Sequence, residues 1–143
     1  MNQARRVGVG PSTPLLAAAA HPILLETGPE VVAGSTRMKA GTAQKIALNT
    51  LSTAVMLRLG RVYDGLMVDM RLSNRKLRAR AALMVAEISG ADAATSEDAI
   101  SLTGGNIKQA SLVALGANPD QSATLLREAG DNLRTAIENL NAS

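Results

Sequence analysis

The near absence of aromatic residues is the feature that most restricts what this chain can fold into. Hydrophobic residues make up 46% of its 143 residues, yet it contains no Phe and no Trp, and its one Tyr is Tyr63. A core must therefore be built from Leu, Ile, Val, Ala and six Met. Such side chains pack between closely spaced helices better than between two β-sheets. We expect a mainly helical chain that forms one domain, or a partial domain with a small helical appendage.

The beginning of the chain predicts a β-α-β unit with two parallel strands. Residues 6–10 are a short β-branched run, residues 11–14 offer a helix start, and residues 23–26 are a second short apolar run. A parallel pair needs cover on both faces, so two strands alone do not make a stable sheet. We expect that a partner supplies more of the sheet or that strands are missing from this chain.

A turn-rich loop then leads into the longest helical pattern of the sequence. Apolar residues recur near helical spacing from Thr36 to Leu59, and Gly60 follows as a stop signal. The pattern is apolar on most sides. We therefore expect this helix to be largely buried, against the sheet on one face and a second subunit on another.

The start of this helix predicts a binding site for an anion such as phosphate. Gly34 lets the backbone approach closely, Ser35 and Thr36 offer hydroxyl groups and a helix cap, and the N–H groups of the first turn face the oxyanion. Arg37 and Lys39 add positive charge. The alternative interpretation is that Ser35 or Thr36 only caps the helix and that both cations are solvated.

The rest of the chain is predicted to be helical from Ser73 onward. Residues 66–70 are ambiguous between a strand and a connector, and an apolar stripe over residues 81–88 ends at Gly90. Later helix starts are predicted at Thr95 and at Asn118-Pro119.

A weak internal repeat occupies this helical part. The pattern of residues 96–110 recurs about 26 residues later, and each copy is a helix, a Gly-x-Asn turn and another helix. We divide the chain into residues 1–72 and residues 73–143, the second being a bundle with two helix-turn-helix repeats.

Composition argues against several classes of function. The net charge of +3 reflects 15 basic against 12 acidic residues, a modest excess, and there are no aromatic residues to stack on bases, so we expect no nucleic-acid partner. The lack of Cys excludes disulfides and thiolate metal sites and is compatible with a cytoplasmic location. His21, the only His, stands in an apolar run where a structural role is expected and a metal site is not.

Membrane segments are not expected. No uninterrupted apolar run approaches the ~20 residues that cross a bilayer. An N-terminal signal peptide is disfavoured because Gly and Pro residues interrupt the apolar stretch that follows Arg5-Arg6.

The strongest motif lies in the run ETGPEVVAGSTRMKAGTAQKIALNTLSTAVMLRLGRVYDGLMVD, which begins at Glu26. It contains a glycine-flanked Ser-Thr-Arg followed by Lys-Ala-Gly-Thr. In these motifs the chain resembles the bacterial N-acetylmuramic acid 6-phosphate etherases and, more loosely, the glucokinase regulatory protein, a sugar-phosphate-binding relative. The resemblance covers nearly the whole chain and weakens toward both ends.

This resemblance implies a fold and an activity. The fold is α/β but predominantly helical in this chain: the C-terminal part of a parallel-sheet sugar-isomerase (SIS) domain, followed by a small helical bundle of the ubiquitin-associated type. The activity is a carbon–oxygen lyase reaction that converts N-acetylmuramic acid 6-phosphate to N-acetylglucosamine 6-phosphate and D-lactate in cell-wall recycling. It needs a general base and a general acid but no metal or redox cofactor.

The resemblance also assigns residues to a sugar-phosphate site. Gly34, Ser35, Thr36 and Arg37 match the family's ligand-binding segment. Glu26 is expected at a strand end, where open α/β sheets gather ligands, and is a candidate for contact with the sugar.

A second set resembles the Asn-x-Lys-Leu element that these proteins bring to a neighbouring subunit's sugar site. It comprises Asn74 and Lys76. We interpret the neighbouring Arg75, Arg78 and Arg80 as a solvated helix face.

We predict no catalytic residue in this chain. The resemblance implies that the family's catalytic glutamates and its Gly-Thr-Ser phosphate loop lie in an N-terminal half that this sequence does not contain. Four remaining carboxylates could in principle act as bases but match no catalytic position of the family: Glu26, Glu30, Asp64 and Asp69. We therefore expect the C-terminal half of an etherase, inactive alone, cytoplasmic, and homodimeric or homo-oligomeric. Two alternatives are a non-catalytic regulatory module that binds a sugar phosphate and a protein-interaction bundle indifferent to sugar phosphates.

Overall fold

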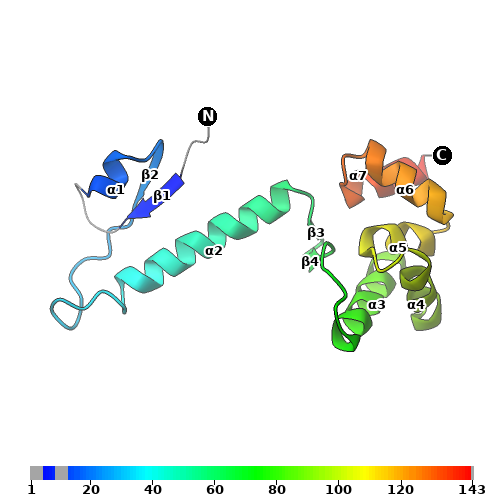
Figure 1. Ribbon diagram of the computed structural model, residues 1–143, viewed down its shortest axis with the longest axis horizontal. Coiled ribbons are helices and arrows are strands. Elements are labelled where there is room, and N and C mark those ends of the chain that lie inside the picture. Colours follow the sequence, from blue (N-terminus) through cyan, green and yellow to red (C-terminus); the bar gives the residue numbers. More distant parts are fainter. Residues whose placement is uncertain (1–4, 9–12, 143) are drawn as a thin grey trace. The chain divides into compact units, whose positions relative to one another are not determined.

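The chain is mainly helical and forms two compact units. The computed structural model describes residues 5–8 and 13–142, and the units are Met1–Val55 and Met56–Ser143, each described here by itself (Figure 1). The described residues also form two small two-stranded sheets. The prediction of a predominantly helical α/β chain is confirmed at this level, while the boundary between residues 72 and 73 stays a prediction.

The first unit opens with the predicted β-α-β arrangement. Strands β1 (Arg5–Gly8) and β2 (His21–Leu24) pair in parallel, and helix α1 (Pro14–Ala17) lies between them in the sequence. The Oγ1 atom of Thr13 caps α1 by accepting a hydrogen bond from the N–H of Leu16 at 3.4 Å. The β-α-β prediction is confirmed, although both strands begin earlier than predicted and residues 9 and 10 lie outside the described residues.

Helix α2 (Ala40–Arg58) follows a long loop. It begins four residues later than predicted, at Ala40 and not at Thr36. Its end is as predicted: Gly60 has a φ of +66°, and its N–H donates to the carbonyl of Leu57 at 3.1 Å. A left-handed glycine is a common way to end a helix.

The described side chains of the first unit form almost no core. Among residues 13–55, Ala40 is the one buried residue, whereas every residue of β2 is exposed. Ile46, Leu48 and Val55 of α2 are also exposed. The prediction that this helix is largely buried is therefore wrong for the single chain, because a two-stranded sheet and a four-residue helix offer too little apolar surface to cover it.

The second unit begins with a β-hairpin in the stretch that the sequence left ambiguous. Strand β3 (Val62–Tyr63) pairs antiparallel with β4 (Leu66–Met67). Asp64 and Gly65 have φ values of +44° and +82°, as a two-residue type I′ turn requires. The Arg134 side chain pairs with the Asp64 carboxylate and lies 5.0 Å from the centre of the Tyr63 ring, which joins the hairpin to the last helix.

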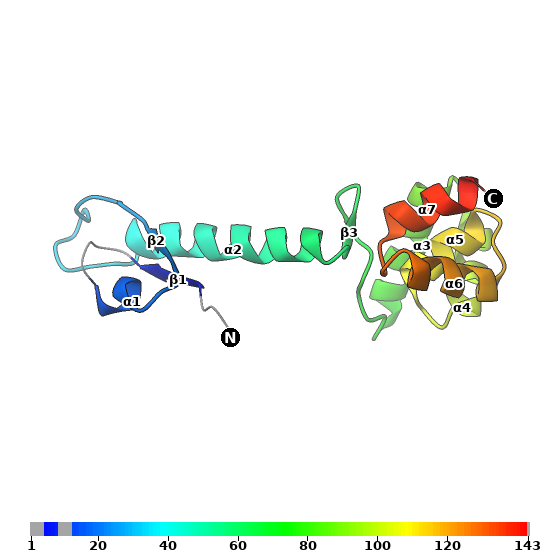
Figure 2. The same ribbon diagram turned by 90° about the horizontal axis from the view of Figure 1, so that it is seen from above.

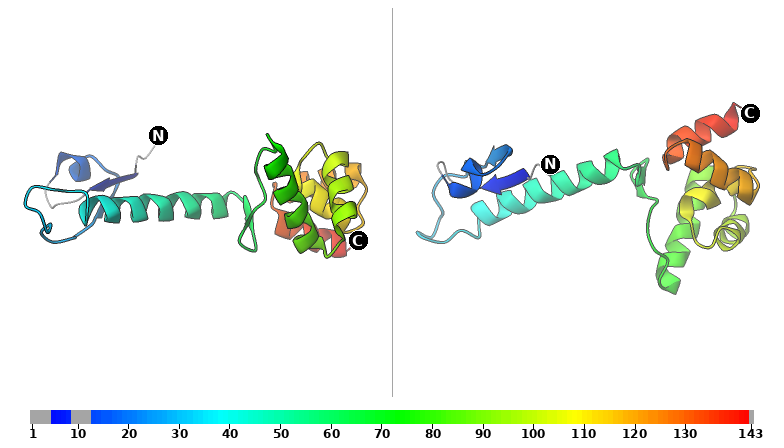
Figure 3. Two further views of the ribbon diagram at one scale, coloured as in Figure 1. Left: turned by 90° about the horizontal axis from the view of Figure 1, so that it is seen from below. Right: turned by 45° about the horizontal axis from the view of Figure 1, so that its top comes forward.

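Five helices build the body of the second unit (Figures 2 and 3). They are α3 (Arg75–Ser89), α4 (Ala93–Leu102), α5 (Ile107–Ala114), α6 (Pro119–Glu128) and α7 (Leu133–Asn141). Helices α3, α4 and α5 pack against one another, and α5 also contacts α6 and α7. The largest fully buried apolar side chains are Val68, Val85, Ile100, Ile107, Leu112 and Leu133. The predicted stripe over residues 81–88 lies in this core and ends at Gly90, whose φ is +74°.

Asn and Asp side chains cap all five of these helices by accepting the N–H of the residue three positions on. They are Asn74, Asp92, Asn106, Asn118 and Asn132. The start at Asn118-Pro119 is confirmed. The start predicted at Thr95 is wrong, because Asp92 caps α4 by accepting the Thr95 N–H at 2.8 Å and the helix begins at Ala93.

A buried cation joins α5 to the loop between α6 and α7. The Lys108 side chain of α5 is 3% exposed, and its Nζ donates to Oδ2 of Asp131 at 2.7 Å and to the Asp131 carbonyl oxygen at 2.9 Å. Asp131 stands in the loop between α6 and α7 with a φ of +63°. This contact fixes that loop against α5.

Candidate functional site

The residues predicted to hold a sugar phosphate in the first unit lie on one loop between β2 and α2. Glu26 is exposed and stands two residues beyond the end of β2. Gly34 has a φ of +81° in a turn closed by the hydrogen bond from the Ser35 N–H to the Val32 carbonyl at 3.0 Å. A type II turn of this kind requires a left-handed residue at its third position, which explains the glycine.

The beginning of α2 is already occupied by a carboxylate of the chain itself. The Lys39 N–H donates to both Glu30 oxygens at 3.1 and 3.2 Å, and the Ala40 N–H donates to Oε1 at 3.1 Å. Two of the N–H groups that we expected to face an external oxyanion are therefore bonded to Glu30. An acceptor with negative charge is favourable at a helix start, which accounts for this arrangement.

The predicted cap at Ser35 or Thr36 is consequently wrong. Thr36 contributes its backbone carbonyl, which accepts the N–H of Gly41 at 2.7 Å, and not its hydroxyl. The Lys39 side chain is also engaged, because its Nζ donates to the Pro29 carbonyl at 2.8 Å. Lys39 therefore links the two ends of the loop through Pro29. The sequence predicted either a solvated cation or a cation that binds the anion.

The polar groups that remain for a ligand come from the far part of the loop. The Thr36 and Arg37 side chains are exposed and Ser35 is half-buried. Arg37 forms no ion pair with any described residue. Two hydroxyl groups and one guanidinium on neighbouring residues are suited to bind a phosphate oxygen array.

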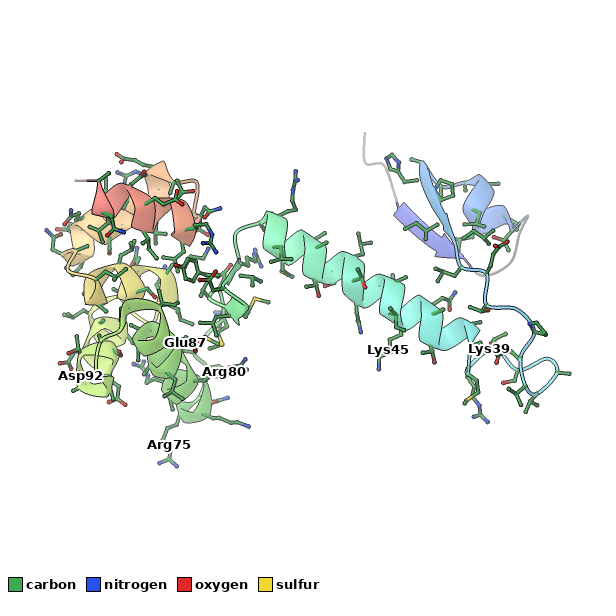
Figure 4. All side chains as sticks on the ribbon, turned by 180° about the vertical axis from the view of Figure 1, so that it is seen from behind. Lys39, Lys45, Arg75, Arg80, Glu87 and Asp92 are labelled. Atoms are coloured by element: carbon green, nitrogen blue, oxygen red, sulfur yellow. The ribbon has the colours of Figure 1, made fainter. Side chains whose placement is uncertain are left out.

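The second predicted group lies at the start of α3. Oδ1 of Asn74 accepts the Leu77 N–H at 2.9 Å, so this side chain caps the helix, and Lys76 is exposed in the first turn. The first turn of α3 contains Arg75 and Lys76 and no acidic residue. Cations at a helix start oppose the helix dipole, so this composition does not serve helix stability. Figure 4 shows Arg75 and Arg80 on this helix and Lys39 and Lys45 around the start of α2.

The structure thus gathers the predicted residues into two groups. Glu26 and Gly34 to Arg37 share the loop before α2, while Asn74 and Lys76 share the start of α3. The groups belong to different units, each described by itself.

Sequence reasoning missed a cavity of about 340 Å³ in the second unit, whose lining includes Arg71, Leu72, Arg78 and Gly105. Arg78, which we interpreted as part of a solvated face, is exposed and also lines this cavity. Gly105 has a φ of +89°, a left-handed conformation that favours glycine, and a Cβ atom there would make an ordinary van der Waals contact of 3.4 Å with Leu72 Cδ1. The paired Gly104-Gly105 is the sequence signal from which a tight turn at this point could have been predicted.

The described residues offer neither a metal site nor a membrane-spanning helix. Within residues 5–8 and 13–142, no group of three or more His, Cys, Asp and Glu side chains is arranged to hold a metal ion. In the same described part, no helix is both long enough and apolar enough to cross a membrane.

Comparison with known proteins gives no family profile that matches this chain but several similar curated proteins. Curated proteins similar to it include several bacterial etherases. An N-acetylmuramic acid 6-phosphate etherase of Deinococcus radiodurans is 51% identical over 128 residues, which are 89% of this chain and 42% of that protein.

Two further relatives with the same name give the same result. The protein of Streptomyces coelicolor is 52% identical over 86% of this chain and 40% of its own length, and that of Pseudothermotoga lettingae is 48% identical over 87% and 42%. The chain therefore spans about two fifths of the length of the curated relatives it matches. It is related over most of its length to the C-terminal half of the N-acetylmuramic acid 6-phosphate etherases, and the predicted resemblance is confirmed.

Proposed function

We propose that this chain is the C-terminal half of an N-acetylmuramic acid 6-phosphate etherase that acts in cytoplasmic cell-wall recycling. The observation that carries the proposal is the identity of 48–52% to proteins of this name across 86–89% of the chain. The complete enzyme cleaves the D-lactyl ether to give N-acetylglucosamine 6-phosphate and D-lactate. The regulatory-module alternative is not favoured, because these relatives are named as etherases.

In this proposal the first unit is part of a larger SIS-type parallel sheet. Its two parallel strands and the exposed apolar residues of α2 support this, because each needs further layers to be covered. The helices α3 to α7 form the bundle of the ubiquitin-associated type. Their arrangement as capped helix pairs supports this assignment.

The loop from Gly34 to Arg37 binds the phosphate group of the sugar. Arg37 supplies two parallel N–H donors, and Ser35 and Thr36 supply hydroxyl donors. Glu26 contacts the sugar from the end of β2. Asn74 and Lys76 reach the sugar site of a neighbouring subunit, with the Lys ammonium as the charged contact.

The reaction is an elimination followed by addition of water. Opening of the sugar ring places an aldehyde beside C2 and acidifies its C–H, so a general base removes that proton while a general acid assists departure of the lactyl oxygen. We assign both groups to residues outside this chain, which is inactive alone.

Three of the four candidate carboxylates support that assignment, while the fourth, Glu26, is assigned to contact with the sugar. Glu30 is bonded to the start of α2, and Asp64 and Asp69 are paired with Arg134 and Arg61. Each of the three already has a partner within the chain.

We also propose that the protein is a homodimer or homo-oligomer. The exposed Ile46, Leu48 and Val55 of α2 support an apolar interface there. Light scattering at micromolar concentration is expected to show an oligomer, and a monodisperse monomer contradicts this part of the proposal.

Binding of N-acetylglucosamine 6-phosphate to the purified chain tests the site. We expect saturable shifts of the amide resonances of residues 34–37 in ¹H–¹⁵N spectra, and at least about tenfold weaker binding in Arg37→Gln, since hydrogen bonds to charged groups are worth this much. Lys45→Gln is the matched control, because Lys45 is an exposed cation on α2 outside the loop. Equal loss in both variants, or no saturable shift, overturns the assignment.

A further inference from the structure

The cavity of the second unit is formed where three segments meet. Its lining includes the apolar Leu72 and the exposed Arg71 and Arg78, which precede and follow the Asn74 cap of α3 in the sequence. The third segment is the Gly104-Gly105 turn between α4 and α5. Hydrogen bonds from the Gly104 and Gly105 N–H groups to the last turn of α4 hold this segment in place.

The cavity carries an excess of positive charge. Asp69 is the one acidic residue in its lining, and Oδ2 of Asp69 forms an ion pair with Nε of Arg61 at 3.2 Å, so its charge is balanced from outside the lining. Arg71 and Arg78 form no ion pair with any described residue. Two unpaired guanidinium groups therefore share one concave polar site.

This charge does not serve the stability of the helix. Arg78 follows Arg75 and Lys76 near the start of α3, where cations oppose the helix dipole and no acidic residue compensates them. An anion bound between Arg71 and Arg78 would reduce this repulsion. The cations are thus explained by a ligand better than by the fold.

We propose that this cavity binds a small anion, a phosphate monoester or a carboxylate, through Arg71 and Arg78. The volume of about 340 Å³ accommodates one such group with a small organic body and lies at the lower end of the range of ligand sites, ~300–1,000 Å³. The planar guanidinium groups match the oxygen geometry of both anions. The proposal does not rest on the proposed function, because Arg71 and Arg78 are not among the residues assigned to the sugar phosphate.

Titration of the ¹⁵N-labelled 143-residue chain with inorganic phosphate, and separately with D-lactate, tests this site. We expect saturable shifts of the Gly104, Gly105 and Asn106 amide resonances that weaken as NaCl is added. The anion that saturates at the lower concentration identifies the ligand as phosphate-bearing or carboxylate-bearing. An absence of saturable shifts with both anions overturns the proposal.

Variants separate the cavity from general electrostatic attraction. The double variant Arg71→Gln/Arg78→Gln is expected to bind at least about tenfold more weakly, because each arginine contributes charged hydrogen bonds. Arg75→Gln/Arg80→Gln is the matched control: it removes the same two charges from exposed positions on α3 that do not line the cavity. An equal loss in this control overturns the proposal.

Two further readouts keep the test decisive. Circular dichroism verifies that the double variant keeps its helices, and Arg71→Lys/Arg78→Lys, which retains the charge, is expected to restore part of the affinity. Arg37→Gln is expected to leave these shifts unchanged, so a failed sugar-phosphate loop and a failed cavity give different results.

Discussion

The buried Lys108 allows the sharpest test of how the helical unit is held together. Truncation to Ala removes three methylene groups from a side chain that is 3% exposed. At about 0.8 kcal/mol for each buried methylene this costs about 2.4 kcal/mol, and the cavity left behind adds to the loss. The hydrogen bonds of the ammonium group add only about 1 kcal/mol, since the Asp131 side chain is 65% exposed and water screens the pair. We therefore expect Lys108→Ala to lower the free energy of unfolding by about 3–4 kcal/mol.

Lys108→Met separates the stem from the charge. It keeps an unbranched side chain of similar length but removes the ammonium group, so we expect a loss of about 1 kcal/mol or less. Asp131→Asn keeps a residue type that tolerates the φ of +63° and removes the carboxylate charge, and we again expect about 1 kcal/mol or less.

Urea unfolding followed by circular dichroism at 222 nm measures these differences. The cooperative transition reports mainly on the second unit, which contains nearly all of the buried residues. If Lys108→Met is as destabilising as Lys108→Ala, burial of the methylene groups is not the main contribution of Lys108 to the free energy of unfolding, and the reasoning is refuted.

Two further predictions concern helix starts. Glu30→Ala is expected to speed hydrogen exchange of the Lys39 and Ala40 amides about fivefold, the equivalent of about 1 kcal/mol of lost capping. Glu30→Gln is expected to have an intermediate effect. Unchanged exchange in Glu30→Ala would show that the carboxylate does not stabilise this turn. Hydrogen bonds from the Thr95 backbone N–H and then from its side chain lower the pKa of Asp92 from its ordinary 3.8, so the stability it adds is present above that value and is lost as the pH falls through the lower folded-state pKa. Asp92→Asn, an equally good cap, is expected to remove this part of the acid dependence of the urea midpoint, and an identical pH profile would count against it.

Features that depend on near neighbours in the sequence could be predicted. The cap at Asn118-Pro119, the stop at Gly60 and the β-α-β order each follow from the residue types at a few adjacent positions. The start of α4 was misplaced because Asp92 and Thr95 are both good caps three residues apart, and local preference does not choose between them.

Features that depend on the path of a loop could not be predicted. The carboxylate of Glu30 reaches the start of α2 from nine residues earlier, and no periodic pattern reports such a contact. The motif of Gly34 to Arg37 indicated the family correctly, yet it did not reveal that Glu30 occupies the helix start. Likewise, an all-round apolar α2 predicts a need for cover but not that this chain lacks the surfaces to supply it.

The Asp64-Gly65 turn is a different case, because its signal was present in the sequence. The strands on either side have only two residues each, too few for an alternating pattern, so the dipeptide was the only sign of a hairpin. The cavity that Arg71 and Arg78 line had no such signal, because it depends on a contact between Gly105 and Leu72, which are far apart in the sequence.

The central claim is that this chain supplies the C-terminal half of an etherase without the groups that transfer protons. The most direct test replaces the matching segment of the Deinococcus radiodurans relative with this chain and measures D-lactate release from N-acetylmuramic acid 6-phosphate, beside the 143-residue chain alone. We predict release by the folded chimera and none above a protein-free blank by the chain alone. A chimera that folds but releases no D-lactate, or release by the chain alone, would contradict the account.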